Sequence, residues 1–329
     1  MKAGVRPRGV EAAAFLAGAV ALAALPLAGV PRSWLLYLVY FSLYLAMANM
    51  WNLLAGYSGL VSLCQPAFIG LAGYTLAVVT WVNLPFSLGI VGGGAIAALF
   101  ALVISVPVFR LRGMYFAIGT LVIPEALRTV FLLWKPVGGE LQGRGAGYVI
   151  KGIAGVSMTE LYWLALAVGV ASVFLMRRLL RSRFGLGLWA IRDNERTAAS
   201  AGVPVFQLKL YAFIVAAFIT GLAGAIFYVY QGYVEPTSAF GVRWTMIVIL
   251  CTVIGGMGTE GGPLAGTLIV LFLNFLLARY GGVSLLIQGA VLVGIMLLAP
   301  RGVMGVVGQL RAAQRLSPPN GQGSLPRET

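Results

Sequence analysis

Apolar runs of about 17–25 residues recur along this chain, and each is long enough to cross the hydrocarbon core of a bilayer. Hydrophobic residues make up 60% of the 329 positions and charged residues only 10%, whereas a soluble domain carries roughly a quarter charged residues. The short alternating segments of a membrane β-barrel are not seen. The sequence therefore predicts an all-α, polytopic transmembrane helical bundle of about eight to ten spans. We place these at roughly 12–30, 34–54, 66–82, 86–108, 114–134, 159–176, 209–230, 240–256, 264–280 and 284–300.

The basic residues predict how the bundle is oriented. The chain has 23 Lys and Arg against 9 Asp and Glu, a formal net charge of +14. In a membrane protein such an excess sets topology and does not by itself indicate nucleic acid. With the N-terminus in the cytoplasm, most of the 23 fall on the cytoplasmic side, so both termini are predicted there. The first run is longer than a usual signal sequence, and we interpret it as an uncleaved helix.

The residue types exclude several kinds of chemistry. Histidine is absent, and Cys64 and Cys251 lie far apart among apolar neighbours. A zinc site, a His-based triad and a disulfide framework are therefore not expected. No lysine follows a glycine-rich loop of the P-loop pattern. We accordingly predict a non-enzymatic chain without a cofactor of its own.

A polar island lies between two apolar spans, within "RFGLGLWAIRDNERTAASAGVPVFQLKLYAF" at residues 183–213. Residues 186–201 favour one short helix, because Ala, Leu, Arg and Glu dominate and no proline interrupts. Gly202 followed by Pro204 is the expected stop. Such a helix, parallel to the inner membrane face, either docks to a partner protein or rests on lipid headgroups.

Two charges lie deep in an apolar run, at Glu125 and Arg128. They are three residues apart on one helical face, so pairing them reduces the cost of placing charge in the membrane. Three interpretations remain open: a structural ion pair, a role in a substrate path, or proton coupling.

Two glycine-rich stretches follow spans on the predicted cytoplasmic side, "GYSGLVSLCQPAFIG" at 56–70 and "GGMGTEGGP" at 255–263. They either form a repeated half-structure that lines a translocation path or allow close helix packing. The glycines concerned are Gly59, Gly70, Gly255 and Gly256. The segment 135–158 is the longest exterior loop, and it is either a flexible connector or a compact fold.

Four segments together resemble one known family. They are "GYSGLVSLCQPAFIGLAGYTLAV" (56–78), "AIRDNERTAASAGVPVFQLKLYAF" (190–213), "GLAGAIFYVYQGYVEPTSAF" (221–240) and "VIGGMGTEGGPLAGTLI" (253–269). In this order they resemble the LivM-type permeases of branched-chain amino acid ABC importers, over roughly residues 35–308. The resemblance implies a permease domain at 1–308, with a cytoplasmic coupling loop at about 177–208. The Pro/Gly/Ser-rich tail at 309–329 is expected to be disordered.

The resemblance also implies partners and a coupling surface. It implies a multi-pass protein of the cell membrane that works with a second permease subunit, two cytoplasmic ATPase subunits holding ATP and Mg, and an extracytoplasmic binding protein. The family's coupling motif is EAA with a glycine four residues after the second alanine. Here Ala198 lies four before Gly202, while Thr197 and Arg196 replace the preferred Ala and Glu. The implied ATPase-coupling residues are Arg192, Asp193, Asn194, Glu195, Ala198, Ala199 and Gly202. A proton- or sodium-coupled secondary transporter of small organic solutes is the alternative.

Overall fold

The computed structural model describes residues 17–136, 144–153, 155–277, 287, 289–290, 293–294 and 302–305. Within these residues, six helices are long and apolar enough to cross a membrane. Two shorter helices, α3 (Gln65–Trp81) and α12 (Gly262–Leu277), complete the bundle. The six are α2 with the π-helical turn η2 (Arg32–Trp51 and Asn52–Tyr57), α4 (Phe86–Val108), α5 (Met114–Leu133), α6 (Met158–Leu180), α9 (Val205–Gln231), and α10 with α11 (Pro236–Ala239 and Arg243–Gly255).

These helices confirm the predicted polytopic helical bundle. Every span predicted between residues 34 and 256 coincides with a helix. Two boundaries differ from the predicted ones: α6 continues to Leu180, beyond the predicted end at 176, and α9 begins at Val205, before the predicted start at 209. A shorter apolar helical stretch, Ala17–Ala28, lies within the predicted first span. The predicted span 284–300 lies largely outside the described residues, and the expected tail at 309–329 lies wholly outside them.

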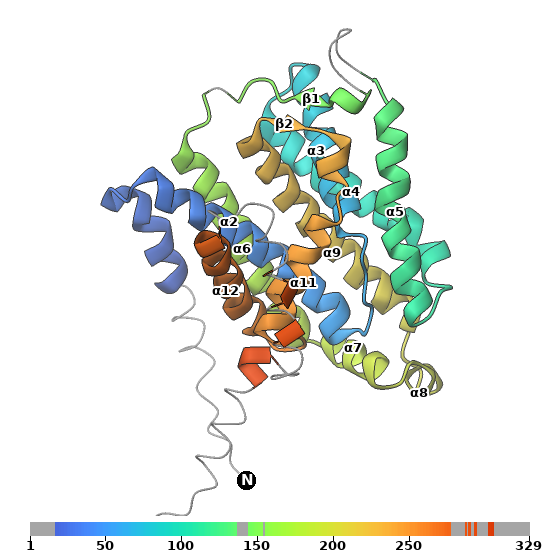
Figure 1. Ribbon diagram of the computed structural model, residues 1–329. Helices are drawn as coiled ribbons and strands as arrows, with labels where there is room; N and C mark the ends of the chain where they lie inside the picture. The colour runs from blue at the N-terminus through green and yellow to red at the C-terminus, as the bar shows by residue number, and fades with distance from the viewer. Residues whose placement is uncertain are drawn as a thin grey trace, which may run out of the picture.

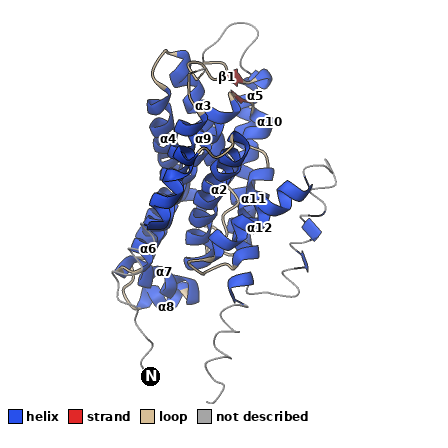
Figure 2. Cartoon of the chain, turned by 90° about the vertical axis from the view of Figure 1, so that its left-hand side faces the viewer, coloured by secondary structure: helices blue, strands red, loops and turns tan. Residues whose placement is uncertain are grey.

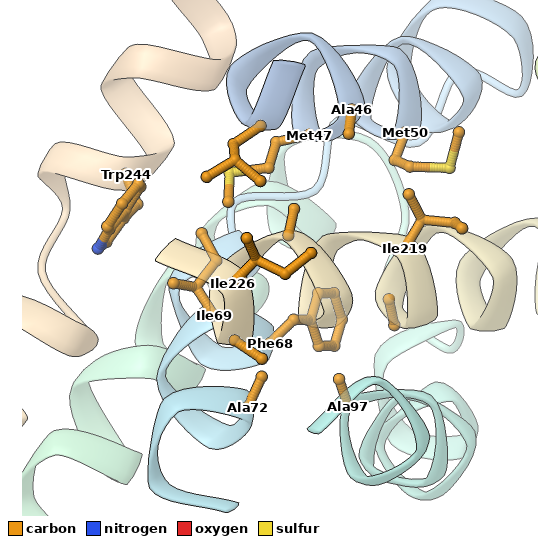
Figure 3. Packing of buried hydrophobic residues seen from close by; sticks show 14 of the residues in the cluster. Ala46, Met47, Met50, Phe68, Ile69, Ala72, Ala97, Ile219, Ile226 and Trp244 are labelled. Carbon is orange, nitrogen blue, oxygen red and sulfur yellow. The ribbon is translucent and has the colours of Figure 1, made fainter. Parts of the chain in front are cut away.

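Helix α9 lies at the centre of the bundle and packs against α2, α3 and α4. Figure 3 shows the apolar side chains that meet there, which come from α2 (Met47, Met50), α3 (Phe68, Ile69) and α9 (Ile219, Ile226). Small residues bring the backbones close together: a methyl group at Gly221 would lie only 2.7 Å from the Cβ of Ala97 on α4. Close approach of this kind is how helices gain packing energy in a membrane, where lipid is as apolar as the side chains.

The chain between η2 and α3 is not helical, although it runs through the interior of the bundle. Backbone at this depth needs internal hydrogen-bond partners, because lipid supplies none. Side chains of three helices supply them. The Trp51 indole donates to the Ser62 carbonyl (2.7 Å), the Leu63 N–H donates to Thr120 Oγ1 (3.0 Å), and Thr245 Oγ1 donates to the Leu63 carbonyl (3.3 Å). Residues 58–64 are therefore fixed to the bundle by these bonds, with Ser58, Leu60, Ser62 and Cys64 buried.

The two ends of the bundle carry different structures, as Figures 1 and 2 show. At one end β1 (Tyr148–Val149) pairs antiparallel with β2 (Tyr233–Val234). The Trp81 indole at the end of α3 donates to the Val149 carbonyl (2.8 Å), so residues 144–153 fold against the bundle. The opposite end carries α7 (Arg183–Asp193) and α8 (Glu195–Ser200).

Candidate functional site

The polar island forms two helices, so the prediction of one helix over 186–201 is wrong. The chain breaks at Asn194, which has extended backbone angles (φ −158°, ψ 108°). Its N–H still bonds to the Ala190 carbonyl and ends α7, while its side-chain oxygen accepts from the Thr197 N–H (3.1 Å) and begins α8. A short Asn side chain competes well for backbone hydrogen bonds, and this local capping outweighs the helix propensity of the neighbouring residues.

Gly202 ends α8 in the left-handed conformation expected of it, with φ +83°. The Gly202 N–H bonds to the Ala199 carbonyl (3.0 Å), and the Val203 N–H bonds to the Ala198 carbonyl (3.0 Å). These two bonds are the Schellman arrangement, in which the last carbonyls of a helix are satisfied by the residues that follow. The chain then turns at Pro204 into α9.

Helix α7 packs its apolar face on the bundle. Gly185, Leu188 and Ile191, spaced three residues apart, are buried, as expected for an amphipathic helix. The Trp189 ring meets the Tyr57 ring at the end of η2 edge-on, with centroids 5.7 Å apart. We refer to residues 183–200 as the α7–α8 unit.

Arg192 connects this unit to both glycine-rich stretches. Its Nη1 donates to the Gly56 carbonyl in η2. A methyl group at Gly258, where φ is +79°, would lie 2.7 Å from the same nitrogen, and one at Gly59 would lie 3.7 Å from the Arg192 Cα. The glycines at 258 and 59 therefore leave room for α7 and its arginine. Gly59, considered above for a translocation path, lies in this contact.

Asn52 joins the same two stretches from inside the bundle and was not identified from the sequence. Its side chain is fully buried. Its Oδ1 accepts from the Gly258 N–H (2.8 Å) and its Nδ2 donates to the Thr259 carbonyl (2.9 Å). In the sequence, the available signal was an amide at the end of an otherwise apolar run. Asn52 thus holds the loop at residues 256–261 by two hydrogen bonds, and Arg192 lies beside Gly258 of the same loop.

A second connection joins α8 to α9. Lys209 Nζ lies 2.7 Å from Glu195 Oε2. The predicted span 209–230 begins at Lys209, whereas in the structure Lys209 lies in the second turn of α9 and is only 8% exposed. Because a buried ammonium needs a partner, this ion pair fixes α8 against the central helix of the bundle.

The remaining predicted coupling residues divide into two groups. Ala198 is buried against the bundle, while Asp193, Asn194 and Ala199 are exposed. A cavity of about 470 Å³ opens beside α8. It is lined by Arg112, Asn194, Glu195, Arg196, Ala199 and Val205. The exposed face of α8 thus has mixed charge and a hollow next to it.

The other singled-out residues lie elsewhere. The expected ion pair between Glu125 and Arg128 is present on α5, with both side chains partly exposed. Gly70 lies against the Phe240 ring, and Gly255 lies against Gly262 where α11 meets α12. Gly256 caps α11. In these contacts Gly70 and Gly255 allow close packing.

The sequence is similar to known membrane transport proteins over most of its length. Residues 33–300 match the family described as "Branched-chain amino acid transport system / permease component". The high-affinity branched-chain amino acid transport system permease protein LivM of Escherichia coli (strain K12) is 28% identical over 294 residues, which cover 80% of this chain and 68% of that protein. No solved structure gives a significant match.

Other relatives have names that refer to different cargo. The autoinducer 2 import system permease protein LsrC of Klebsiella pneumoniae is 31% identical over 206 residues, covering 58% of this chain and 56% of that protein. The L-arabinose transport system permease protein AraH of Escherichia coli (strain K12) is 29% identical over 210 residues, covering 62% and 61%. The family match includes every helix from α2 to α12. This chain therefore belongs to the branched-chain amino acid permease family, the membrane permease components of ABC-type transport systems.

Proposed function

We propose that this chain is a permease subunit of an ATP-driven importer of branched-chain amino acids, and that cytoplasmic ATPase subunits dock on its α7–α8 unit. The cargo is suggested by the family description and by the LivM relatives. The observation that carries the docking proposal is the position of Arg192, which bonds to η2 and contacts the 256–261 loop. A surface helix held in this way can pass a displacement to several spans.

The contacts define two routes from the surface into the bundle and one link inside it. Arg192 leads to α2 through Gly56, and Glu195 leads to α9 through Lys209. Asn52 then joins the end of α2 to the loop between α11 and α12. On this proposal, closure of the ATPase pair moves α8, and the stiff helices convert that movement into a change of access, as in other rigid-body transitions.

The exposed face of α8 suits a protein partner better than lipid. Asp193 and Glu195 are beside Arg192 and Arg196, so acidic and basic residues are mixed here and the face is not uniformly positive. Peripheral helices that bind anionic headgroups are instead rich in Lys and Arg on their polar face. The hollow beside Asn194 and Ala199 would receive a side chain of the partner. ATP and Mg would be held by that partner, with no cofactor in this chain.

The proposed orientation follows from the basic residues. Arg110, Arg112, Arg181 and Arg183 cluster toward the α7–α8 end, which the positive-inside rule assigns to the cytoplasm. Both termini are then cytoplasmic, and the β1–β2 end faces outward in the cell membrane. A second permease subunit and a binding protein would complete the importer.

Substituting Arg192 tests the coupling. The complete complex would be reconstituted in proteoliposomes with a leucine-loaded binding protein, and uptake and ATP hydrolysis would be measured together. We expect Arg192→Met to lower leucine uptake per ATP about tenfold, since a hydrogen bond to a charged group contributes about 1.5–3 kcal/mol. Arg178→Met removes the same charge from an exposed position on α6 outside the α7–α8 unit; it is the matched control and should match the wild type.

The same assay separates this proposal from a secondary transporter. Leucine uptake by the wild type should require ATP inside the vesicles. Uptake driven by a proton or sodium gradient, without ATPase subunits, would refute the proposed function.

A further inference from the structure

A cavity with a partly polar lining lies at the other end of the bundle from the α7–α8 unit. It has a volume of about 670 Å³ and is lined by residues of α2, the end of α9, the stretch from β2 to α11, and α12. Sites for small ligands typically have about 300–1,000 Å³. With the orientation proposed above, the cavity faces the outer half of the membrane, where a binding protein would release its cargo.

Two opposite charges line this cavity. Glu235 follows β2 and precedes α10, while Arg243 is the first residue of α11. Within the described part of the chain, neither side chain forms an ion pair or a hydrogen bond. Glu235 is partly buried and Arg243 is exposed. Charged side chains near a membrane interior normally pair with one another. An anion and a cation in one cavity that have no partner among the described residues therefore indicate a ligand that carries both charges.

An aromatic wall completes the cavity. The Tyr40 ring lies 5.8 Å from the Tyr44 ring and 6.2 Å from the Phe227 ring, between centroids. The Trp244 ring lies 4.7 Å from the Phe227 ring. Such a wall offers a continuous apolar surface with hydroxyl groups at its edge, which suits an aliphatic side chain.

The two charged residues are held by the folded end of the bundle. Phe240, between them, is buried and its ring stacks on the Tyr74 ring of α3 with centroids 5.9 Å apart. The Tyr233 hydroxyl, just before Glu235, donates to the Ala146 carbonyl. Burial, together with the Glu235 carboxylate, raises the pKa of Tyr233, so this hydroxyl stays a neutral donor. The backbone that positions Glu235 and Arg243 is therefore anchored at both ends.

We infer that this cavity is a binding site for a zwitterionic α-amino acid with an apolar side chain. Arg243 would bind the carboxylate, Glu235 the ammonium group, and the wall formed by Tyr40, Phe227 and Trp244 the side chain. This inference rests on the proposed function, because it assigns residues to the cargo of that importer. A neutral sugar could hydrogen-bond to these two residues but has no charge to pair with either of them.

The first experiment measures leucine uptake by the reconstituted complex. We expect Glu235→Gln and Arg243→Gln each to lower uptake about tenfold or more, because each leaves one charge of the zwitterion unpaired. Arg32→Gln changes the charge equally at the same end of the bundle but outside the cavity, and should match the wild type. Wild-type uptake in both cavity variants, or an equal loss in the control, would overturn the inference.

The second experiment measures binding directly and does not depend on ATP hydrolysis. The only cysteines, Cys64 and Cys251, are buried, so Thr237→Cys would place a single reactive thiol at the exposed lining of the cavity. Leucine at ten times its Kd should slow labelling of this thiol about tenfold. Leucinamide, which lacks the carboxylate, and 4-methylpentanoate, which lacks the ammonium group, should protect far less.

The two measurements distinguish the inference from the proposed function. Protection by leucine without ATP-dependent uptake would support the cavity and refute the importer. Uptake in the wild type with no protection of the thiol would retain the importer and refute the cavity. Equal protection by leucine and leucinamide would refute the role of Arg243.

Discussion

Replacing Gly202 with valine isolates the contribution of one backbone conformation to coupling. Gly202 has φ +83°, and a Cβ added at this position would meet no atom within 4 Å. An added Cβ therefore does not clash with the bundle. The cost comes from the backbone alone, and for a β-branched residue in the left-handed region it is about 1–3 kcal/mol.

Helix α8 has little with which to offset that cost. It has six residues, and Ala198 is its one buried residue. The two hydrogen bonds that end it, from Gly202 to Ala199 and from Val203 to Ala198, both require the left-handed turn. At about 1.4 kcal/mol per factor of ten, a cost of about 1–3 kcal/mol would lower the population of the ordered unit about 5- to 150-fold relative to other arrangements.

The assay compares three complexes in proteoliposomes by leucine uptake per ATP hydrolysed. We expect Gly202→Val to lower this ratio about tenfold or more while the subunit still inserts in the membrane. Gly202→Asn is the matched control, because asparagine tolerates the left-handed region, and should retain most of the coupling. If valine leaves the ratio unchanged, or asparagine lowers it as much as valine does, the proposed role of this turn is wrong.

Two further substitutions test other contacts. Asn52→Leu removes both hydrogen bonds to the 256–261 loop and should lower the free energy of unfolding by about 2–4 kcal/mol, which thermal unfolding of the purified complex in detergent would detect; an unchanged midpoint would contradict this. Glu125→Gln removes the carboxylate that pairs with Arg128. Uptake by this variant should still depend on ATP and should not respond to an imposed proton gradient. If the wild type instead shows gradient-driven uptake that Glu125→Gln abolishes, the secondary transporter is supported.

The sequence predicts the spans well because each depends on a property of one local segment. An apolar run of sufficient length must be a helix in lipid, since no other element satisfies its own backbone. The stop at Gly202 is also predictable because it depends on local geometry: a glycine followed by a nearby proline ends a helix. The break at Asn194 is also local, but a capping asparagine competes with a sequence of strong helix formers, and propensity alone favoured the continuous helix.

The rest of the candidate site depends on contacts between distant residues. Asn52 meets Thr259 across 207 positions, and Arg192 meets Gly56 across 136. The cavity unites residues of α2, α9, α11 and α12, and its two charged residues could not be brought together until those helices were placed. The glycine-rich stretches show the same limit. Their composition allows either a path or close packing, and the neighbours of Gly59, Gly70 and Gly255 supply the packing contacts.

Helix α11 connects the two proposed sites directly. Its first residue, Arg243, lines the cavity, and its C-cap, Gly256, belongs to the loop that Asn52 holds and that Arg192 lies beside. At 1.5 Å per residue, 13 residues span about 20 Å, and a helix of this length moves as a rigid body. On the proposed mechanism, a shift of the 256–261 loop driven from α7–α8 would therefore move the Arg243 guanidinium relative to Glu235, which α10 and β2 anchor separately. ATP-driven closure would then lower the affinity for a zwitterion, because it would separate Arg243 from Glu235. Binding and release would thus be controlled through one helix.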